Sequence, residues 1–341
     1  MTANIISSNT SAITNDNQKK DSAGISKKRK AEGNIEDVKT QEVVKLLKTE
    51  ERDLTTFTGD IVQAVPEMKL GLDMELMLLQ QVRGEKKNFY LSDEFFYYSY
   101  SAPSSNDIFL YSKEKMSKGG MGAIFKGVEI KNNKVKKVVL KQIKDTEKYR
   151  QIREGQEPLS ISSKNIMKTK ISENTSIGVL QVFPFYDSDL DAIAENNGVS
   201  FEESLDIAIQ SAQGIADLHA EGYIHRDIKP GNIMVKKTDK GWKAKISDLD
   251  TVIKQEKSSS FVIGTLGTVG FYPRTVEKIG QPFTQETDMY AFGKTLEILF
   301  KSKTISEDKR SQLQNLVQQL TSDNSLSAKE TVEELKKIRD S

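Results

Sequence analysis

The stretch YIHRDIKPGNIMV, residues 223–235, decides the fold class of this chain. Asp227 and Asn232 lie five positions apart, Lys229 lies between them, and an apolar run that predicts a short strand follows. A second short strand is predicted over residues 243–247, and Asp248 ends it. Metal chemistry at such carboxylates, if present, must use oxygen ligands, since the chain has no cysteine and only two histidines.

Two further motifs precede this stretch. SKGGMG, residues 117–122, lies between two predicted strands, and its glycines would let the backbone approach a phosphate without side-chain obstruction. A glycine-rich hairpin turn has the same composition, so the motif alone is weak. Lys141 then closes the apolar run VVLK, where an ordinary surface lysine is the plain alternative.

Taken in order, the glycine loop, the strand lysine, H-R-D-x-x-x-x-N and the later aspartate resemble the eukaryotic-type protein kinases. The resemblance covers nearly all of residues 108–341. It implies an α+β, bilobal fold with a small β-rich N-lobe over 108–186 and a larger helical C-lobe over 187–341. Before it, residues 1–34 read as a disordered basic and polar tail, and residues 35–107 as an N-terminal extension outside the kinase fold with helical and aromatic strand segments.

The resemblance implies ATP and Mg²⁺ as cofactors and assigns roles to the matching residues. Asp227 would accept or orient the proton of the substrate hydroxyl, and Lys229 would neutralise charge on the phosphoryl group. Asn232 and Asp248 would hold Mg²⁺, while Lys141 would contact the α and β phosphates.

The resemblance also implies a nucleotide pocket. Lys141 would pair with a glutamate of the following helix, for which Glu154 has the family's spacing and Glu157 is the alternative; Pro158 would disturb that helix. Phe183 would take the gatekeeper position, and the backbone N–H of Tyr186 would donate to adenine. The loop that covers the nucleotide would contribute Gly119, Gly120, Gly122 and Ile124.

The sequence departs from the family pattern after the metal-binding aspartate. The motif D-F-G reads Asp248-Leu249-Asp250 here. Leu249 keeps an apolar packing group, and an aspartate tolerates left-handed backbone better than most residues. We expect Asp250 to be a solvent-facing or capping carboxylate rather than a second metal ligand.

Other departures concern the region that binds protein substrates. The segment 264–280 resembles the end of an activation loop but lacks the alanine and glutamate of A-P-E. Asp288 and Gly293 match D-x-x-x-x-G, yet the stretch from Gly293 to Leu313 leaves little room for the helix that often docks substrates. Such reduced domains resemble some injected bacterial effectors and viral kinases.

The resemblance implies a Ser/Thr protein kinase that acts on a protein substrate and also on itself, since Lys229 and Thr268 are similar to residues of the Ser/Thr group. Alternatives are a pseudokinase scaffold that binds nucleotide or a partner without phosphotransfer, and a small-molecule phosphotransferase. An activating partner is a further expectation, as is an activation-loop phosphate beside Arg226. Candidate acceptors are Thr251, Ser258, Ser259, Ser260 and Thr265.

Composition excludes several other classes. The 50 Lys and Arg against 49 Asp and Glu give no field for gripping nucleic acid, and the absence of cysteine excludes disulfides and thiolate metal sites. No signal peptide or membrane span is predicted, so we expect a soluble protein, cytoplasmic or nuclear, in a host cell if it is an injected effector. The basic run SKKRK, residues 26–30, is either an import signal or a solvated charge run.

Overall fold

The computed structural model describes twelve stretches of the chain: residues 89–91, 95–102, 105–119, 122–131, 134–147, 149, 161–169, 171–175, 178–195, 198–257, 267–279 and 282–341. The predicted tail, the basic run 26–30 and the helical segments of the extension lie outside them. The chain divides into two compact units, 1–87 with 133–135 and 88–132 with 136–341. Apart from residues 134 and 135, the described residues belong to the second unit.

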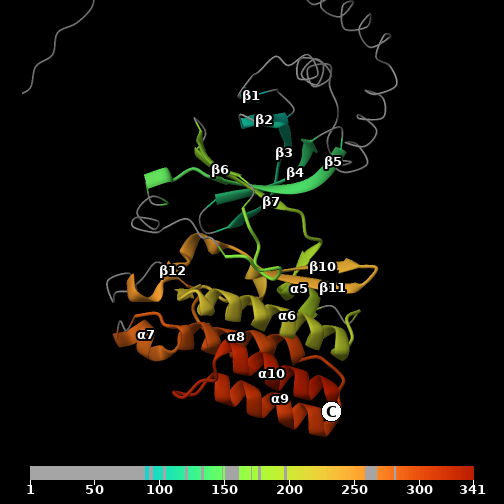
Figure 1. Cartoon of the computed structure of the whole chain (residues 1–341), viewed down its shortest axis with the longest axis vertical. Helices are drawn as coiled ribbons and strands as arrows, with labels where there is room; N and C mark the ends of the chain where they lie inside the picture. Colours follow the sequence, from blue (N-terminus) through green and yellow to red (C-terminus); the bar gives the residue numbers. More distant parts are fainter. Residues whose placement is uncertain are drawn as a thin grey trace, which may run out of the picture. The chain divides into compact units, whose positions relative to one another are not determined.

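The N-lobe is built on a sheet of seven described strands with the order β1-β2-β3-β4-β5-β7-β6 (Figure 1). Its core is apolar, with Phe109, Phe125, Leu140 and Leu180 among the buried side chains. The sheet begins at residue 89, inside the aromatic segment that precedes residue 108. The strands are β1 (Phe89–Leu91), β2 (Phe95–Ala102), β3 (Ser105–Gly119), β4 (Gly122–Lys131), β5 (Lys134–Ile143), β6 (Ile171–Thr175) and β7 (Gly178–Pro184).

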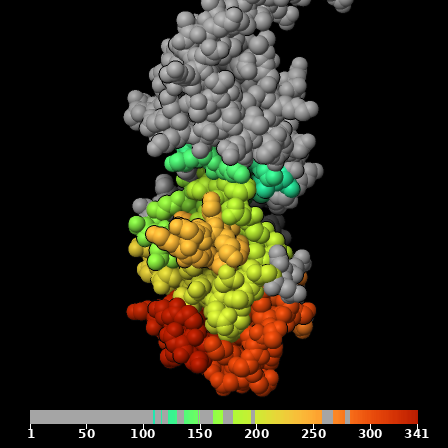
Figure 2. Space-filling model, turned by 90° about the vertical axis from the view of Figure 1, so that its right-hand side faces the viewer, coloured from blue at the N-terminus to red at the C-terminus, as the bar shows by residue number. Residues whose placement is uncertain are grey.

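The C-lobe is mainly helical. Its helices are α5 (Leu190–Glu195), α6 (Phe201–Ala220), α7 (Arg274–Ile279), α8 (Gln285–Phe300), α9 (Glu307–Leu320) and α10 (Ala328–Asp340). Two small sheets join them: β8 (Ser188–Asp189) with β10 (Ile233–Thr238) and β11 (Gly241–Ile246), and β9 (Tyr223–Ile224) with β12 (Ile253–Lys254). Figure 2 shows the β10–β11 hairpin, in orange, over α6, with α9 and α10 at the base of the lobe. The bilobal α+β fold is the predicted one.

Helix α6 forms because its sequence caps its first turn and buries one face. The Ser200 hydroxyl accepts from the backbone N–H of Glu203, whose carboxylate accepts from the Ser200 N–H, so two N–H groups are satisfied. Gly214 lies where a Cβ atom would be 2.6 Å from the Asn165 carbonyl oxygen. That glycine therefore lets α6 approach the segment that pairs with β11.

Helix α8 passes through the centre of the C-lobe. Its buried residues include Asp288 and Phe292, and Gly293 lies 3.0 Å, measured from an ideal Cβ, from the side chains of Leu320 and Thr321. The six residues 301–306 that follow form no helix before α9 begins. Within the part of the chain described here, no helix has the length and apolar character needed to cross a membrane.

Candidate active site

The first cluster of the site is centred on the Asp227 carboxylate. Its Oδ2 accepts from Lys229 Nζ and from Asn232 Nδ2, both at 2.8 Å, and its Oδ1 accepts from the Thr268 hydroxyl at 2.7 Å. Lys229 Nζ also donates to the Thr268 oxygen, at 2.7 Å. Three side chains therefore fix the orientation of one carboxylate, and one of them comes from a segment about forty residues away in sequence.

Asn232 holds the two halves of the site together. Its Nδ2 donates to the Asp227 carbonyl as well as to the carboxylate, while its own carbonyl accepts from the backbone N–H and the hydroxyl of Ser247. Ser247 directly precedes Asp248. Because the Nδ2 atom is directed to Asp227, the amide oxygen is directed away from it and remains an oxygen ligand.

The loop that carries Asp227 is clamped from below by Asp288 of α8, which is 1% exposed. Its carboxylate accepts from the backbone N–H groups of His225 at 2.7 Å and Arg226 at 2.9 Å, and Nε2 of His219 lies 2.9 Å away. This clamp holds Arg226 in the left-handed region, at φ 70°. Such a conformation costs about 1–2 kcal/mol for a residue with a Cβ, so it requires the surrounding contacts.

The fully buried His225 fixes the same loop from inside. Its Nε2 lies 2.9 Å from the Ser247 carbonyl, and its Nδ1 accepts from the Asp227 N–H at 3.3 Å. A neutral imidazole protonated on Nε2 satisfies both contacts. The His225 ring therefore fixes the backbone distance between Asp227 and Ser247, which precedes Asp248.

The second cluster joins the two lobes. Lys141 of β5 is 7% exposed, and its Nζ donates to Asp248 Oδ1 at 2.6 Å and to Asp250 Oδ2 at 2.8 Å. Burial alone lowers the pKa of Lys141, but the two carboxylates outweigh it and hold that pKa above its ordinary value. The amine is therefore a positive charge at neutral pH.

The structure corrects the interpretation of Asp250. The expectation of a solvent-facing or capping carboxylate is wrong, because Asp250 is 4% exposed and bonded to Lys141. The left-handed residue of the D-L-D motif is Asp248, at φ 56°, whereas Asp250 lies in the short 3-10 helix Leu249–Thr251. Asp250 therefore supplies a negative charge next to Lys141, and its backbone is not in the left-handed region.

The expected nucleotide pocket is described in part. Gly119 and Gly122 close the β3–β4 hairpin opposite each other, and Ile124 follows on β4. A Cβ at Gly122 would lie 2.4 Å from the Gln142 carbonyl oxygen, so close packing on β5 already requires this glycine. Phe183 and Tyr186 are half-buried at the end of β7, and burial raises the pKa of Tyr186. Gly120, Glu154 and Glu157 lie outside the described residues.

The side-chain oxygens of Asn232 and Asp248 suit a hard cation that takes most of its ligands from water and phosphate. The described residues contain no group of three or more His, Cys, Asp or Glu side chains that could hold a metal by themselves. Asn232 offers an amide oxygen, and the 36% exposed side chain of Asp248 offers a carboxylate. Magnesium commonly takes one or two protein oxygens and completes its shell with phosphates and water, which is the chemistry these two residues suit.

Arg226 and Thr251, the candidate phosphorylation site that the structure describes, lie outside the two clusters. Arg226 is 4% exposed, and its Nε donates to the Thr251 carbonyl. Burial lowers the pKa of its guanidinium to about 10, although the charge of Asp288 acts in the opposite direction. The Thr251 hydroxyl donates to the His225 carbonyl. Ser258, Ser259, Ser260 and Thr265 lie outside the described residues, so phosphorylation beside Arg226 stays a prediction.

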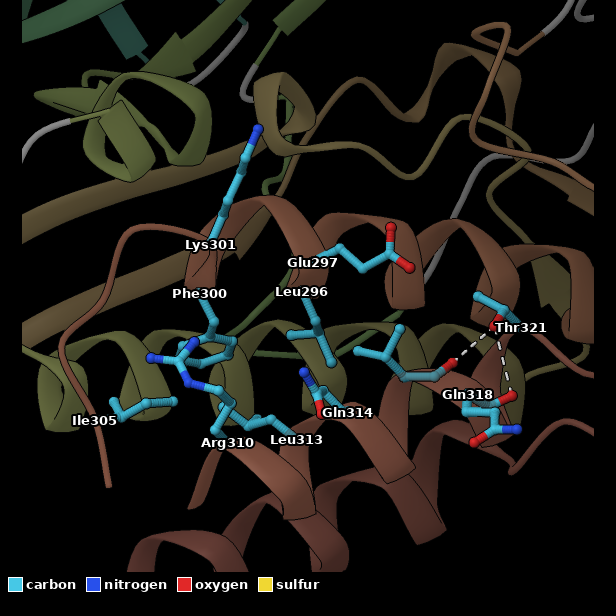
Figure 3. Close-up of a pocket in the computed structure, with 11 residues that line it drawn as sticks. Leu296, Glu297, Phe300, Lys301, Ile305, Arg310, Leu313, Gln314, Gln318 and Thr321 are labelled. Carbon is cyan, nitrogen blue, oxygen red and sulfur yellow. Dashed lines mark hydrogen bonds between the residues drawn. The ribbon is translucent and has the colours of Figure 1, made fainter. Parts of the chain in front are cut away.

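A recess of about 430 Å³ lies between α8 and α9, at the end of α8 remote from Asp288 (Figure 3). Leu296 and Phe300 of α8 face Leu313 of α9 across it, and charged side chains of both signs, Glu297 and Arg310, border it. None of the residues predicted to act on substrate borders it.

The sequence does not predict the contacts of three members of these clusters, Gln181, Asp250 and Thr268. Gln181 contacts Asp250 through a hydrogen bond at 2.8 Å, and its signal was only its place one strand away from Lys141. The D-L-D motif marks Asp250 as a departure from the family pattern but does not show that it faces Lys141. Thr268 marks similarity to the Ser/Thr group, and its bonds to Asp227 and Lys229 are not predictable from its position in the sequence.

Comparison with known proteins identifies the family of the chain. The family model of the protein kinase domain matches residues 110–341, and the chain therefore belongs to the protein kinase family. Among curated relatives, a probable serine/threonine-protein kinase of Dictyostelium discoideum is 36% identical over 109 residues, which are 31% of this chain and 6% of the relative. A mitogen-activated protein kinase kinase kinase of Caenorhabditis elegans is 29% identical over 188 residues, 54% of this chain and 19% of the relative.

A dual serine/threonine and tyrosine protein kinase of Xenopus laevis is 34% identical over 119 residues, 35% of this chain and 12% of the relative. The matched region thus spans less than one fifth of the length of each of these three relatives. The comparisons establish the family, and they carry no information on the substrate of this chain.

Proposed function

We propose that this chain is an ATP- and Mg²⁺-dependent protein kinase that phosphorylates Ser and Thr hydroxyls of a protein substrate and also its own. The observation that carries the proposal is the Asp227 carboxylate with Lys229, Asn232 and Thr268 bonded to it. Phosphoryl transfer demands positioning and charge stabilisation more than covalent chemistry, and this cluster supplies both.

Each residue of the cluster has a defined task in that reaction. Asp227 would receive the hydroxyl proton of the substrate, and Lys229 would offset negative charge next to it. Thr268, which both donates to Asp227 and accepts from Lys229, would keep the two side chains at a fixed separation. The bond from Thr268 to Asp227 brings this part of the segment 267–273 next to the carboxylate.

The nucleotide would be held from the opposite side. Asn232 and Asp248 would bind Mg²⁺, which when bound supplies positive charge for the phosphate oxygens. Lys141, buried and charged, would contact the phosphates under the glycine loop. Tyr186, just beyond β7, would offer its backbone to the base.

We infer specificity for Ser and Thr from the presence of the Lys229–Thr268 pair. Relatives whose names include serine/threonine kinases support this inference. Since the names also include dual-specificity kinases, phosphoamino acid analysis of the product decides the acceptor. An origin as an injected effector or viral kinase, nuclear import and an activating partner stay predictions.

The test incubates the full chain with Mg²⁺, labelled ATP and a generic basic protein, beside Asp227→Asn. The matched control is Asp239→Asn in the exposed β10–β11 turn. Loss of the positioned base should lower the rate by about 10²–10⁴-fold, while the control keeps the wild-type rate. Equal transfer by Asp227→Asn would contradict the proposal. Absence of transfer by the wild type, with stabilisation by nucleotide, would favour the pseudokinase scaffold.

A further inference from the structure

The amine of Lys141 lies at the end of a four-carbon stem that has many rotamers, so its position must be set by what it binds. Among the described residues, the two carboxylates that face it are Asp248 and Asp250. The family pattern provides one positioning carboxylate, a glutamate from the helix after β5. Here one is provided from the loop after β11, at the position where the family has glycine.

The two carboxylates differ in their access to solvent. The Asp248 side chain is 36% exposed and the Asp250 side chain is 6% exposed. A cation that binds the exposed Asp248 competes with Lys141 for the same oxygens, because both are positive. The enclosed Asp250 is then the carboxylate that continues to hold the amine.

Asp250 is itself fixed from the N-lobe side. Its Oδ1 accepts from Gln181 Nε2 at 2.8 Å, and the same nitrogen donates to the Tyr149 hydroxyl at 2.9 Å. Gln181 of β7 is the register partner of Lys141 on β5, so the two side chains leave neighbouring strands at the same level. One carboxylate thus bridges both side chains, one oxygen to each.

Asp250 is also fixed from the C-lobe side. The next residue, Thr251, donates its hydroxyl to the His225 carbonyl, and its own carbonyl accepts from Arg226 Nε. The pairing of β12 with β9 continues this connection along the chain. The carboxylate that meets Lys141 is therefore tied to the loop that carries Asp227.

We propose that Asp250 is the positioning residue for Lys141: it holds the amine in place for its phosphate contact and leaves Asp248 to the cation. The inference rests on the proposed function, since the contact it serves is the one expected between Lys141 and ATP. Glu154, which lies outside the described residues, is the competing candidate.

The first experiment needs no nucleotide and no activity. The full chain receives a short pulse of acetic anhydride, and mass spectrometry compares acetylation of Lys141 with that of the exposed Lys144 in the same digest. Asp250→Asn should raise the Lys141 rate about tenfold, because the amine loses one of the two carboxylates that hold it and leaves its buried position more often. Lys144 and the Asp239→Asn control should not change.

Gln181→Met removes the bond that orients Asp250 at nearly constant volume, so it should raise Lys141 acetylation in the same direction by a smaller factor. If Asp250→Asn does not fold, Gln181→Met alone tests whether Asp250 positions Lys141. Glu154→Gln is labelled in the same experiment, because Glu154 is the competing positioning residue. Unchanged labelling in both the Asp250 and Gln181 variants, or a larger rise in Glu154→Gln than in Asp250→Asn, would overturn the proposal.

The second readout is the affinity for a fluorescent ATP analogue, with and without Mg²⁺. Asp250→Asn should weaken binding about tenfold when affinity is measured well below the melting temperature of each variant, because losing a buried carboxylate also destabilises the fold. A positioning role further predicts that Asp250→Glu, which restores the charge, recovers more affinity than Asp250→Ala. If the chain transfers no phosphate at all, the acetylation result still stands, so failure of this inference is distinguishable from failure of the proposed function.

Discussion

The Asp288 clamp yields the prediction with the best-defined magnitude. In Asp288→Asn the side chain keeps its shape, but one accepting oxygen becomes an amide that itself donates. The carboxylate now serves the N–H groups of His225 and Arg226 and the His219 ring. The amide oxygen can replace at most one side of the carboxylate, so at least one buried backbone N–H faces another donor.

The cost follows from these contacts. A buried N–H without a partner costs about 1–3 kcal/mol, and the remaining bonds lose the strength that a charged acceptor gives them. We therefore expect Asp288→Asn to lower the free energy of unfolding of the C-lobe by roughly 2–5 kcal/mol. The strained Arg226 then loses its support, and Asp227 beside it moves away from its partners.

The measurement combines urea denaturation at neutral pH with hydrogen exchange at the amides of His225 and Arg226. Asp323→Asn, in the exposed loop between α9 and α10, is the matched control and should change neither. Faster exchange at both amides is expected for Asp288→Asn. A loss below about 0.5 kcal/mol with unchanged exchange would refute the reasoning, because a surface substitution has an effect of that size.

The pH dependence has a definite sign. Burial alone raises the pKa of Asp288, but the hydrogen bonds and charges from His219 and the backbone of His225 outweigh it and lower that pKa. A carboxyl with a depressed folded pKa contributes stability that is complete above the unfolded value of about 3.9 and is lost as pH falls through the folded pKa. The gap between wild type and Asp288→Asn should therefore be constant near neutral pH and narrow below about pH 4.

Two further substitutions test the packing and the substrate side of the site. Gly214→Ala places a Cβ 2.6 Å from the Asn165 carbonyl oxygen and should lower the free energy of unfolding by about 1–3 kcal/mol despite the gain in helix propensity. The control Gly231→Ala has open space around the new Cβ and should not lower it. Equal melting temperatures for the two variants would contradict this expectation. Thr268→Val removes the hydroxyl between Asp227 and Lys229 and should lower kcat about 10–100-fold with little change in the KM for ATP, and Thr268→Ser should restore it. A valine variant with wild-type kcat would show that the hydroxyl is dispensable.

The spacing within H-R-D-x-x-x-x-N was enough to predict that Asp227 and Asn232 lie close together, because this motif is local. Asp227 and Asn232 lie on one short loop, so their separation in the sequence fixes their separation in space. Lys141 lies near the end of β5 and Asp248 follows β11, and apolar residues make both strands recognisable. The bilobal arrangement followed from the change of period from strands to helices near residue 187.

The environment of a residue could not be predicted in the same way when it depends on distant segments. Whether Asp250 faces water or Lys141 is decided by how the two lobes meet, and no local pattern contains that information. The left-handed backbone of Arg226 depends on Asp288, more than sixty residues later. Gly214 reads as an ordinary flaw in a helix until the carbonyl of Asn165 is known to lie against it.

The bond between Lys141 and Asp250 joins residues 109 positions apart, and the clamp on Asp227 is completed only by a helix that begins at residue 285. Contacts of such long range are costly to close early, so they form late in folding. We expect a nascent chain on the ribosome to have both lobes partly collapsed before Lys141 finds its carboxylates. A chain that ends before α8 would keep Lys141, Asp227, Asn232 and Asp248 and still lack the Asp288 clamp that supports the loop of Asp227.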